Sequence, residues 1–271
     1  MFFGLTEEQE MIVETVRSFV ENEIYPHESL VESEGFVPTE IAQDIKQKCI
    51  NLGFYACNFP ENIGGAGLNH LDFALVEREL GRGSMALTHF FGRPQNILMA
   101  CKGEQIEKYL LPAVRGELMD ALAMTEPDAG SDVRGMKCFA KSQGTDWIVN
   151  GTKHFISGAE HADFVIVFIA TGEEKTEKGP KKKITAFLVD RGTPGFVIRD
   201  GYNSVSHKGY KNMILEFDDC RLPKEQVLGE VDGGFEVMNT WLYATRLTVA
   251  AMSVGRARRC FDYALSYSAE R

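Results

Sequence analysis

Residues 122–132 read LAMTEPDAGSD and lie where an apolar run ends in a polar loop. Pro127 fixes one backbone φ angle, and Gly130 can adopt a positive φ that most other residues avoid. Such a loop presents backbone N–H groups and short hydroxyls, here those of Thr125 and Ser131, to a ligand. The stretch therefore predicts a binding loop for a flat, hydrogen-bonding ligand edge or for a phosphate.

A second segment, GTKHFISG at residues 151–158, follows a short predicted strand. It places an aromatic, an apolar and a hydroxyl side chain in sequence at Phe155, Ile156 and Ser157. No GxGxxG follows a predicted strand, which argues against a Rossmann dinucleotide site. The two segments together predict one binding site of another kind.

The composition is that of a globular protein. The chain has 271 residues, 44% hydrophobic and 25% charged, which suits one large domain or two ordinary ones. A net charge of −10 argues against a nucleic-acid surface. No apolar stretch approaches the roughly 20 residues of a membrane span, and the acidic start MFFGLTEEQEM does not suggest a signal peptide.

Metal binding is not predicted. The six cysteines are scattered without a CxxC pair, and the six histidines are equally dispersed. His154 and His161 are the closest histidine pair, but no cysteine or further histidine stands near them to complete a four-ligand site. The cysteines are expected to be reduced, mostly buried thiols.

Residues 1–118 predict a helical domain. Thr6 and Gln9 form a capping-box pattern, and the first helix is expected to stop before Pro26. A second helix is expected from Pro38 to Gly53, where a proline can open a helix and a glycine can end it. Three further helices are expected at about His70–Leu80, Ser84–Cys101 and Glu104–Val114.

Residues 119–230 predict a β-domain, either a small antiparallel barrel or a sandwich. Short runs of β-branched and aromatic residues alternate with turn signals, at Ala121–Met124, Cys138–Ser142, Trp147–Val149, Phe164–Ala170, Thr185–Val189, Phe196–Arg199 and Met213–Phe217. Between two of them lies GEEKTEKGPKKK, residues 172–183, which is expected to be an exposed hairpin tip. Because glutamates are interspersed with the lysines, a solvated loop is favoured over a nucleic-acid patch.

Residues 231–271 predict the opening of a C-terminal helical bundle. The helical period returns at Gly233, and an apolar stripe from Phe235 to Ala257 runs toward Arg271 without a stop signal. The polypeptide is therefore expected to continue beyond this helix in its parent protein. The resulting fold class is α+β and multidomain, with a helical domain, a β-domain and the start of a second helical domain.

This order of domains, together with several motifs, resembles the acyl-CoA dehydrogenase family over the whole chain. TEPDAGSD at residues 125–132 is the most specific motif. The others are PENIGGAG at 60–67, YLLP at 109–112, LPKEQVL at 222–228 followed by GGF, and the Thr245-Arg246 pair. Jointly these motifs are highly specific, whereas singly only the first is.

The resemblance implies an FAD site. The family's isoalloxazine contacts fall on Leu122, Met124, Thr125, Phe155, Ile156 and Ser157. In the family an indole often occupies the place of Phe155. Gly130 and Ser131 match positions that meet the flavin pyrophosphate or the pantetheine of the substrate. The alternative to a flavin site is a purely structural role for these residues, as a capped turn and an aromatic side chain in the core.

The same resemblance implies α,β-dehydrogenation of an acyl-CoA thioester, with an electron-transfer flavoprotein as partner and a homodimer or homotetramer as assembly. It implies a location in the bacterial cytoplasm or the mitochondrial matrix. The catalytic base of most family members lies late in the C-terminal domain, and a minority place it at the position of Thr245, which cannot serve. The base is therefore expected beyond Arg271, and these residues alone are not expected to turn over substrate.

Two arginines are candidate substrate contacts. Arg246 matches a family arginine near the pantetheine and is the favoured CoA contact, with a helix-surface arginine as the alternative. Arg93 would line the acyl pocket, where it could select an acyl chain ending in a carboxylate or simply pair with a local acid. Two other functions stay open: a related flavin oxidase or monooxygenase, and a truncated, non-catalytic paralogue acting as an assembly module.

Overall fold

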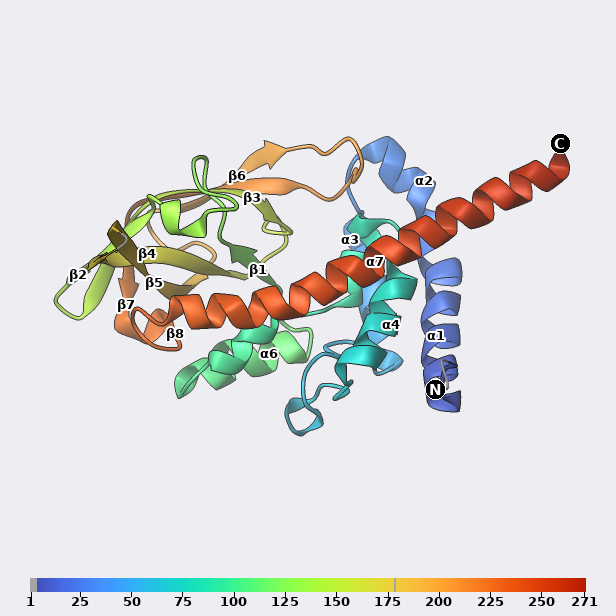
Figure 1. Ribbon diagram of the computed structural model, residues 1–271, viewed down its shortest axis with the longest axis horizontal. Coiled ribbons are helices and arrows are strands. Elements are labelled where there is room, and N and C mark those ends of the chain that lie inside the picture. Colours follow the sequence, from blue (N-terminus) through green and yellow to red (C-terminus); the bar gives the residue numbers. More distant parts are fainter. Residues whose placement is uncertain (1–3, 178) are drawn as a thin grey trace. The chain divides into compact units, whose positions relative to one another are not determined.

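The computed structural model describes residues 4–177 and 179–271, which divide into two compact units (Figure 1). Unit 1 contains residues 4–93, 207–209 and 242–271, and unit 2 contains the described residues of 94–206 and 210–241. Residues 94–118, which the sequence assigns to the helical domain, pack in unit 2 with the β-strands. In the described part of the chain, no helix is long and apolar enough to cross a membrane.

The helices are α1 Glu7–Phe19, α2 Tyr25–Glu34, α3 Thr39–Asn51, α4 His70–Leu80, α5 Met85–Thr88, α6 Leu111–Val114 and α7 Gly234–Glu270. Among the described helices, α1 and α4 begin at a side-chain cap, Thr6 and Asn69 respectively. Before α1, Thr6 Oγ1 accepts a hydrogen bond from the Gln9 backbone N–H at 3.3 Å, and Gln9 Oε1 accepts one from the Thr6 N–H at 3.1 Å. The predicted capping box is confirmed.

The prediction that the first helix stops before Pro26 was wrong. After α1 the chain makes a π-helical turn, Val20–Ile24, and continues directly into α2 with Pro26 in its first turn. A proline is tolerated there because the first N–H groups of a helix have no intrahelical acceptor. Pro112 repeats this arrangement at the start of α6, behind the π-helical turn Ile106–Leu110.

The single helix expected over Ser84–Cys101 is broken in the structure. The short helix α5 is followed by 3₁₀ turns at His89–Phe91 and Asn96–Ala100, with an irregular segment between them. Gly92 has a φ of 80°, and a Cβ at this residue would lie 1.8 Å from the Tyr55 ring. Only glycine fits this contact, and the left-handed conformation of Gly92 ends the helical path.

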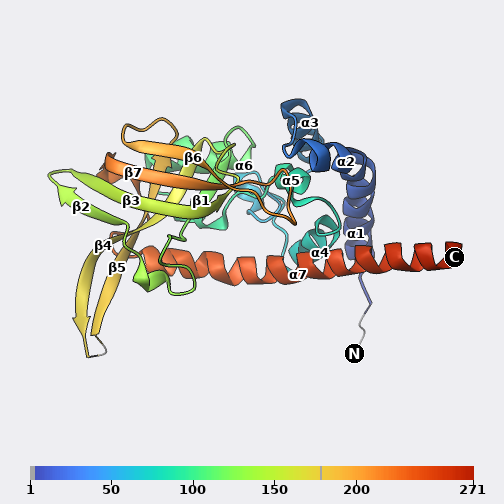
Figure 2. The ribbon, with the colours of Figure 1, turned by 90° about the horizontal axis from the view of Figure 1, so that it is seen from above.

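Unit 2 is organised around one curled sheet of eight strands (Figures 1 and 2). The strands are β1 Asp120–Ala123, β2 Phe139–Gln143, β3 Asp146–Ser157, β4 Phe164–Thr176, β5 Gly179–Asp190, β6 Phe196–Tyr202, β7 Asn212–Pro223 and β8 Val227–Leu228. Their order is β6-β7-β3-β2-β4-β5-β8, and β1 pairs separately with β4.

Two details differ from the predicted antiparallel barrel or sandwich. Most neighbours are antiparallel, but β2 meets β4 in parallel with Phe139 opposite Ala170, and β1 runs parallel to β4, from Asp120 opposite Phe164 to Ala123 opposite Val167. The pairing of β1 with β4 is possible because β2 and β3 lie between the two strands in the chain and provide the long crossover that parallel strands need. The edge strands β6 and β8 are not paired with each other in the described residues, so the sheet stays open.

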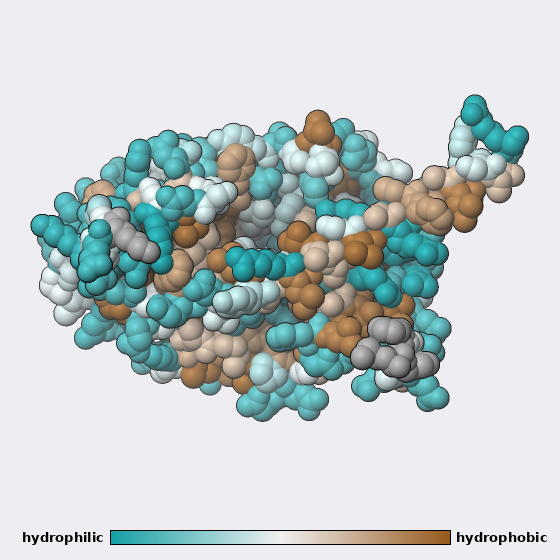
Figure 3. All heavy atoms as spheres, in the orientation of Figure 1, coloured by the Kyte–Doolittle hydropathy of each residue, from teal (hydrophilic) through white to brown (hydrophobic). Residues whose placement is uncertain are grey.

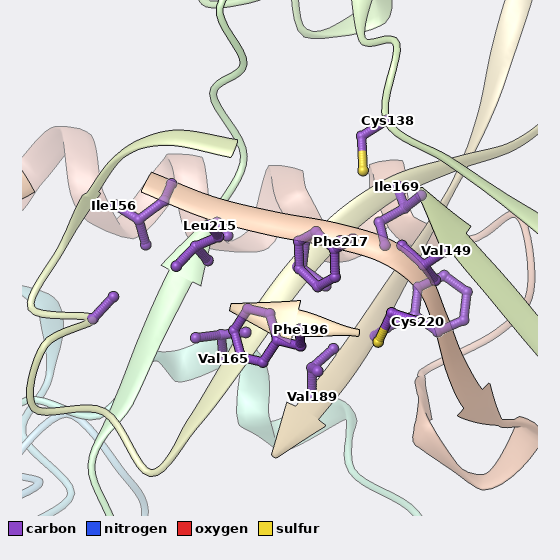
Figure 4. Close-up of a cluster of buried hydrophobic side chains, with 14 of the residues drawn as sticks. Cys138, Val149, Ile156, Val165, Ile169, Val189, Phe196, Leu215, Phe217 and Cys220 are labelled. Carbon is purple, nitrogen blue, oxygen red and sulfur yellow. The ribbon is translucent and has the colours of Figure 1, made fainter. Parts of the chain in front are cut away.

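The core of unit 2 lies against the inner face of this sheet (Figure 4). Aromatic side chains of β6 and β7 stack there, with the ring centroids of Phe196 and Phe217 4.9 Å apart. All residues of β4 from Phe164 to Ala170 are buried, which explains why that strand reads as a continuous apolar run. Beyond Ala170, β4 and β5 continue as a long hairpin (Figure 2).

That hairpin carries the charged segment expected to be a loop tip. Glu173 lies opposite Lys182 and Glu174 opposite Lys181, and residue 178 falls outside the described residues. Opposite charges on facing strands are mutually favourable. Most of residues 172–183 are therefore exposed strand, with both signs of charge on it.

Within unit 1, α4 and α7 cross with their backbones in contact. A Cβ on Gly255 would lie 1.9 Å from the Arg78 carbonyl oxygen, and one on Gly81 would lie 2.3 Å from that of Met252. Further along α7, Arg259 donates to both carboxylate oxygens of Glu28, at 2.7 and 2.5 Å. The second half of α7 is thus held by close backbone packing and a bidentate ion pair.

Only part of the apolar stripe predicted on α7 is buried. Met238 and Met252 are buried, whereas Val249 and Val254 are exposed. Phe261 and Leu265, nearer the C-terminal end of α7, are exposed as well. Figure 3 shows apolar surface along this part of the molecule. In the described residues, the apolar stripe predicted on α7 is therefore buried only in part.

We expect Gly255→Ala to destabilise unit 1 by about 1–3 kcal/mol, because the added methyl group must push α7 away from α4. Helix propensity alone would give the opposite sign, since alanine favours a helix interior by about 1 kcal/mol over glycine. Urea unfolding followed by circular dichroism measures the change. The matched control is Ser253→Ala on the exposed side of α7; a loss no larger than that of this control would contradict the crossing.

Candidate functional site

The first strand of the sheet ends in the loop of residues 122–132. Ala121 and Ala123 are buried in the core of unit 2. Because successive side chains of a strand point to opposite faces, Asp120 and Leu122 face away from that core. Leu122, Met124 and Thr125 are each half-buried. Leu122, a predicted flavin contact on β1, thus lies on the face of the strand that is turned away from the core.

A buried ion pair lies at the base of this loop. Lys153 Nζ and Glu126 Oε1 are 2.7 Å apart, and both side chains are almost fully buried, at 0% and 3% exposed. Glu126 also accepts hydrogen bonds from the backbone N–H groups of Lys137 at 2.5 Å and Cys138 at 3.1 Å. A buried charge pair of this kind is tolerated when the remaining polar atoms are hydrogen-bonded, as they are here.

The pair joins the two segments that the sequence singles out. Lys153 Nζ donates a second hydrogen bond to the Met124 carbonyl at 3.0 Å. The next residue of β3, His154, donates its backbone N–H to the Thr125 carbonyl at 2.8 Å. The structure therefore brings the loop 122–132 and the segment 151–158 side by side within unit 2.

The three residues of β3 that are predicted to contact a flavin, Phe155, Ile156 and Ser157, have different surroundings. Phe155 is 54% exposed and has a φ of 59°, at a bulge in the pairing of β3 with β7. Ile156 is buried, and its side chain points into the core (Figure 4). Ser157 Oγ donates to Asn212 Oδ1 at 3.0 Å. Only the backbone of Ile156 can therefore meet a ligand, whereas Phe155 offers its ring.

The middle of the loop is open. Glu126 and Ala129 exchange backbone hydrogen bonds across Pro127 and form a tight turn. Gly130 and Ser131 follow and are exposed. Gly130 does not use its freedom to adopt a positive φ, and a Cβ there would meet no protein atom within 4 Å. The described residues do not require glycine at this position, which leaves room for a ligand to approach the backbone.

Arg93 pairs with an acid inside unit 1. Its Nε lies 3.1 Å from Glu77 Oε1, and the Glu77 side chain is fully buried. Burial raises the pKa of Glu77, and the charge of Arg93 opposes that shift. Of the two interpretations of Arg93, the structure favours pairing with a local acid over selection of an acidic acyl chain.

Arg246 lies in the part of α7 that belongs to unit 1. Its side chain is exposed, and its guanidinium lies 6.0 Å from the Tyr243 ring centroid. Tyr243 is itself exposed. The local geometry leaves Arg246 able to bind an anionic group.

A second polar network in unit 2 was not predicted. The Asp120 carboxylate accepts a hydrogen bond from the Gln95 N–H at 3.3 Å, and Gln95 Oε1 accepts one from Trp241 Nε1 at 2.6 Å. Burial raises the pKa of Asp120 to about 7. The network therefore places a titratable carboxyl on the same face of β1 as Leu122.

The ion pair of Glu126 and Lys153 was not predicted either, although the sequence pattern indicates that Lys153 is buried. Val149, Lys153 and Ile156 are buried along β3, so a lysine occupies an inward position of a strand. A buried lysine needs an acidic partner.

The structure shows no candidate metal site in its described residues. Among residues 4–177 and 179–271, no three His, Cys, Asp or Glu side chains are placed to share an ion.

The fold is of a helix–sheet–helix class. Helices precede the sheet, a long helix follows it, and a polar loop held by a buried ion pair follows the first strand. Comparison with known proteins identifies the class more closely. Acyl-CoA dehydrogenase N-terminal, middle and C-terminal domain families match residues 6–117, 121–220 and 232–271, respectively. The chain belongs to the acyl-CoA dehydrogenase family.

Individual relatives agree with this assignment. The short-chain specific acyl-CoA dehydrogenase of Homo sapiens mitochondria is 33% identical over 98% of this chain and 64% of the relative. The caffeyl-CoA reductase-Etf complex subunit CarC of Acetobacterium woodii is 33% identical over 100% of this chain and 70% of the relative. The structure of a Mycobacterium smegmatis glutaryl-CoA dehydrogenase in complex with FADH2 matches with a TM-score of 0.85 at 27% identity, over 98% of this chain and 67% of that one. The chain thus spans about two thirds of the length of these relatives.

We expect Lys153→Met to destabilise unit 2 by about 3–5 kcal/mol, because it leaves the Glu126 carboxylate buried without a counter-charge. Adding Glu126→Gln should recover part of this loss. Thermal unfolding of the two variants measures both effects. Lys141→Met, at an exposed lysine on β2, is the matched control. If the double variant is as unstable as the sum of the single ones, the proposed coupling is absent.

The raised pKa of Asp120 predicts a pH dependence of stability. The folded pKa of about 7 lies above the ordinary value of 3.8, so the folded state binds this proton more tightly than the unfolded state. The stabilisation is complete below about pH 4 and is lost as the pH rises toward 7. Asp120→Asn should remove this part of the slope, measured by urea unfolding from pH 4.5 to 8. Glu117→Gln, at an exposed acid, should leave it; an unchanged slope in Asp120→Asn would disprove the assignment.

Proposed function

We propose that this chain provides the cofactor-binding part of an FAD-dependent acyl-CoA dehydrogenase, which oxidises the α,β-bond of an acyl-CoA thioester. One observation carries the proposal. The hydrogen bond between the His154 N–H and the Thr125 carbonyl puts a loop of hydrogen-bonding groups next to the exposed Phe155 ring. A flat ring with a polar edge fits such a pair of surfaces.

The donor groups of this region fit a flavin. Neither the backbone N–H nor the hydroxyl of Thr125 is bonded to another described residue, so both can meet the pyrimidine edge of the ring. Beyond the turn, Gly130 leaves its backbone open to a close approach, and the Ser131 hydroxyl is exposed. These two residues suit a pyrophosphate or a pantetheine chain.

A bound flavin would supply the hydride acceptor for oxidation of the α,β-bond of the substrate. The residues of this chain bind and orient: Thr125 donates hydrogen bonds to the ring edge, Phe155 covers part of the ring and excludes water, and Leu122 and Met124 line the adjoining surface. Ser157 contributes from the next strand, with its hydroxyl held by Asn212. The proposal assigns binding to these residues and assigns no proton abstraction to them, because Thr245 lacks a basic group.

Substrate and partners follow from the same proposal. Arg246, exposed on α7, is proposed to contact the CoA portion of the acyl-CoA. The relative that is named as part of an Etf complex supports an electron-transfer flavoprotein as redox partner. A homodimer or homotetramer, in the bacterial cytoplasm or the mitochondrial matrix, is part of the same proposal.

Two other functions make different predictions for purified protein. A related flavin oxidase or monooxygenase would also be yellow, but its reduced flavin would react rapidly with oxygen. A non-catalytic assembly module would bind no flavin. Intact mass, flavin absorbance and the rate of reoxidation in air distinguish the three.

We expect Thr125→Val to weaken FAD binding about fivefold, since a net hydrogen bond contributes about 1 kcal/mol. Quenching of flavin fluorescence on titration into ligand-free protein measures the affinity. Thr145→Val, in the exposed turn between β2 and β3, is the matched control. Equal affinities of the two variants would rule out the hydroxyl of Thr125 as a flavin contact, and absence of any FAD binding in the unaltered protein would refute the proposed function.

A further inference from the structure

Phe155 has an unusual backbone conformation for a bulky residue. Its φ of 59° lies in the left-handed region, which is a strained backbone conformation for a non-glycine residue. The neighbouring inward side chains, Lys153 and Ile156, are both buried. The bulge between them turns the Phe155 ring outward instead of into the sheet.

A second bulge lies on the other side of β7. The pairing of β6 with β7 shifts between Arg199 and Tyr202, so that Tyr202 and Ser157 lie opposite the same residue, Asn212. Gly201 permits this approach, because a Cβ there would lie 2.1 Å from the Asn212 carbonyl oxygen. Two irregular strands thus place their aromatic residues at one level of the sheet.

The rings of Phe155 and Tyr202 stack on each other. Their centroids are 4.5 Å apart, with 26° between the ring planes. Tyr202 is held in turn, because its hydroxyl and His154 Nδ1 are within hydrogen-bonding distance at 2.9 Å. Phe155 remains 54% exposed and Tyr202 40% exposed. The stack therefore occupies one face of the Phe155 ring and leaves much of it uncovered.

Side-chain packing alone does not account for this arrangement. The stabilisation from a stacked aromatic pair is no larger than the conformational cost of the left-handed Phe155. Burial adds little, because both rings stay exposed. A strained, solvent-facing aromatic residue beside a ligand loop is a frequent sign of a functional contact.

We propose that Tyr202, held by His154, is a positioning residue that fixes the Phe155 ring so that its open surface stacks against the flat ring of a bound flavin. This inference rests on the proposed function and extends it to two residues outside the binding loop. Tyr202 acts through Phe155. A ring that is already fixed loses less conformational entropy when the ligand binds.

The test is a double-mutant cycle on FAD affinity, measured by flavin fluorescence quenching. Tyr202→Leu should weaken binding about three- to tenfold, and Tyr202→Phe, which keeps the ring, should restore most of that loss. Phe155→Ala should weaken binding at least as much. Adding Tyr202→Leu to Phe155→Ala should have no further effect, because the ring that Tyr202 holds is gone.

A readout without flavin accompanies the cycle. In ligand-free protein, Tyr202→Leu should speed amide hydrogen exchange at residues 154–157, whereas Tyr267→Leu, at a comparably exposed tyrosine of α7, should change neither exchange nor affinity. If Tyr202→Leu weakens binding equally with and without Phe155, or leaves affinity unchanged while Phe155→Ala weakens it, the positioning role is overturned and the proposed function stands. If the unaltered protein binds no FAD, both are overturned.

Discussion

The ion pair of Lys153 and Glu126 is the interaction that joins the loop of residues 122–132 to β3 in unit 2. Its two charges are buried and pair with each other, and in the described part of the chain they are also hydrogen-bonded to the Met124 carbonyl and the amides of residues 137 and 138. The pair therefore fixes the start of the loop, the beginning of β2 and the middle of β3 at once. Glutamate in the TEPDAGSD motif is best understood as the anchor that allows its neighbours to face a ligand.

Local signals in the sequence were enough for elements whose ends are set by their own residues. The capping box at Thr6 and the bounds of α4 follow from capping, periodicity and turn residues. Each predicted run overlaps a strand, but β3, β5 and β7 extend well beyond the runs. The joining of the loop at Thr125 to the segment at Phe155 was also anticipated. Such features can be predicted because the residues that determine them lie close together in the sequence, within one element or one motif.

Features that depend on contacts distant in the chain could not be predicted. The proline at position 26 stays inside a helical path because a π-helical turn precedes it, and propensity says nothing about that turn. The break at Gly92 arises from the Tyr55 ring, and the parallel pairing of β1 arises from the route of the chain through β2 and β3. The partner of Asp120 lies 25 residues away and that of Arg93 lies 16 residues away, by subtraction of residue numbers. Such pairs become visible only once the chain is folded.

The distribution of tryptophan gives the division into two units a spectroscopic meaning. The chain has two tryptophans, Trp147 on β3 and Trp241 at the start of α7, and both belong to unit 2. Indole emission therefore reports on the sheet and its ligand loop, whereas most of the helical signal in circular dichroism comes from unit 1. Different midpoints in the two signals would resolve separate melting of the units, and a shared midpoint would mark the chain as one cooperative folding unit.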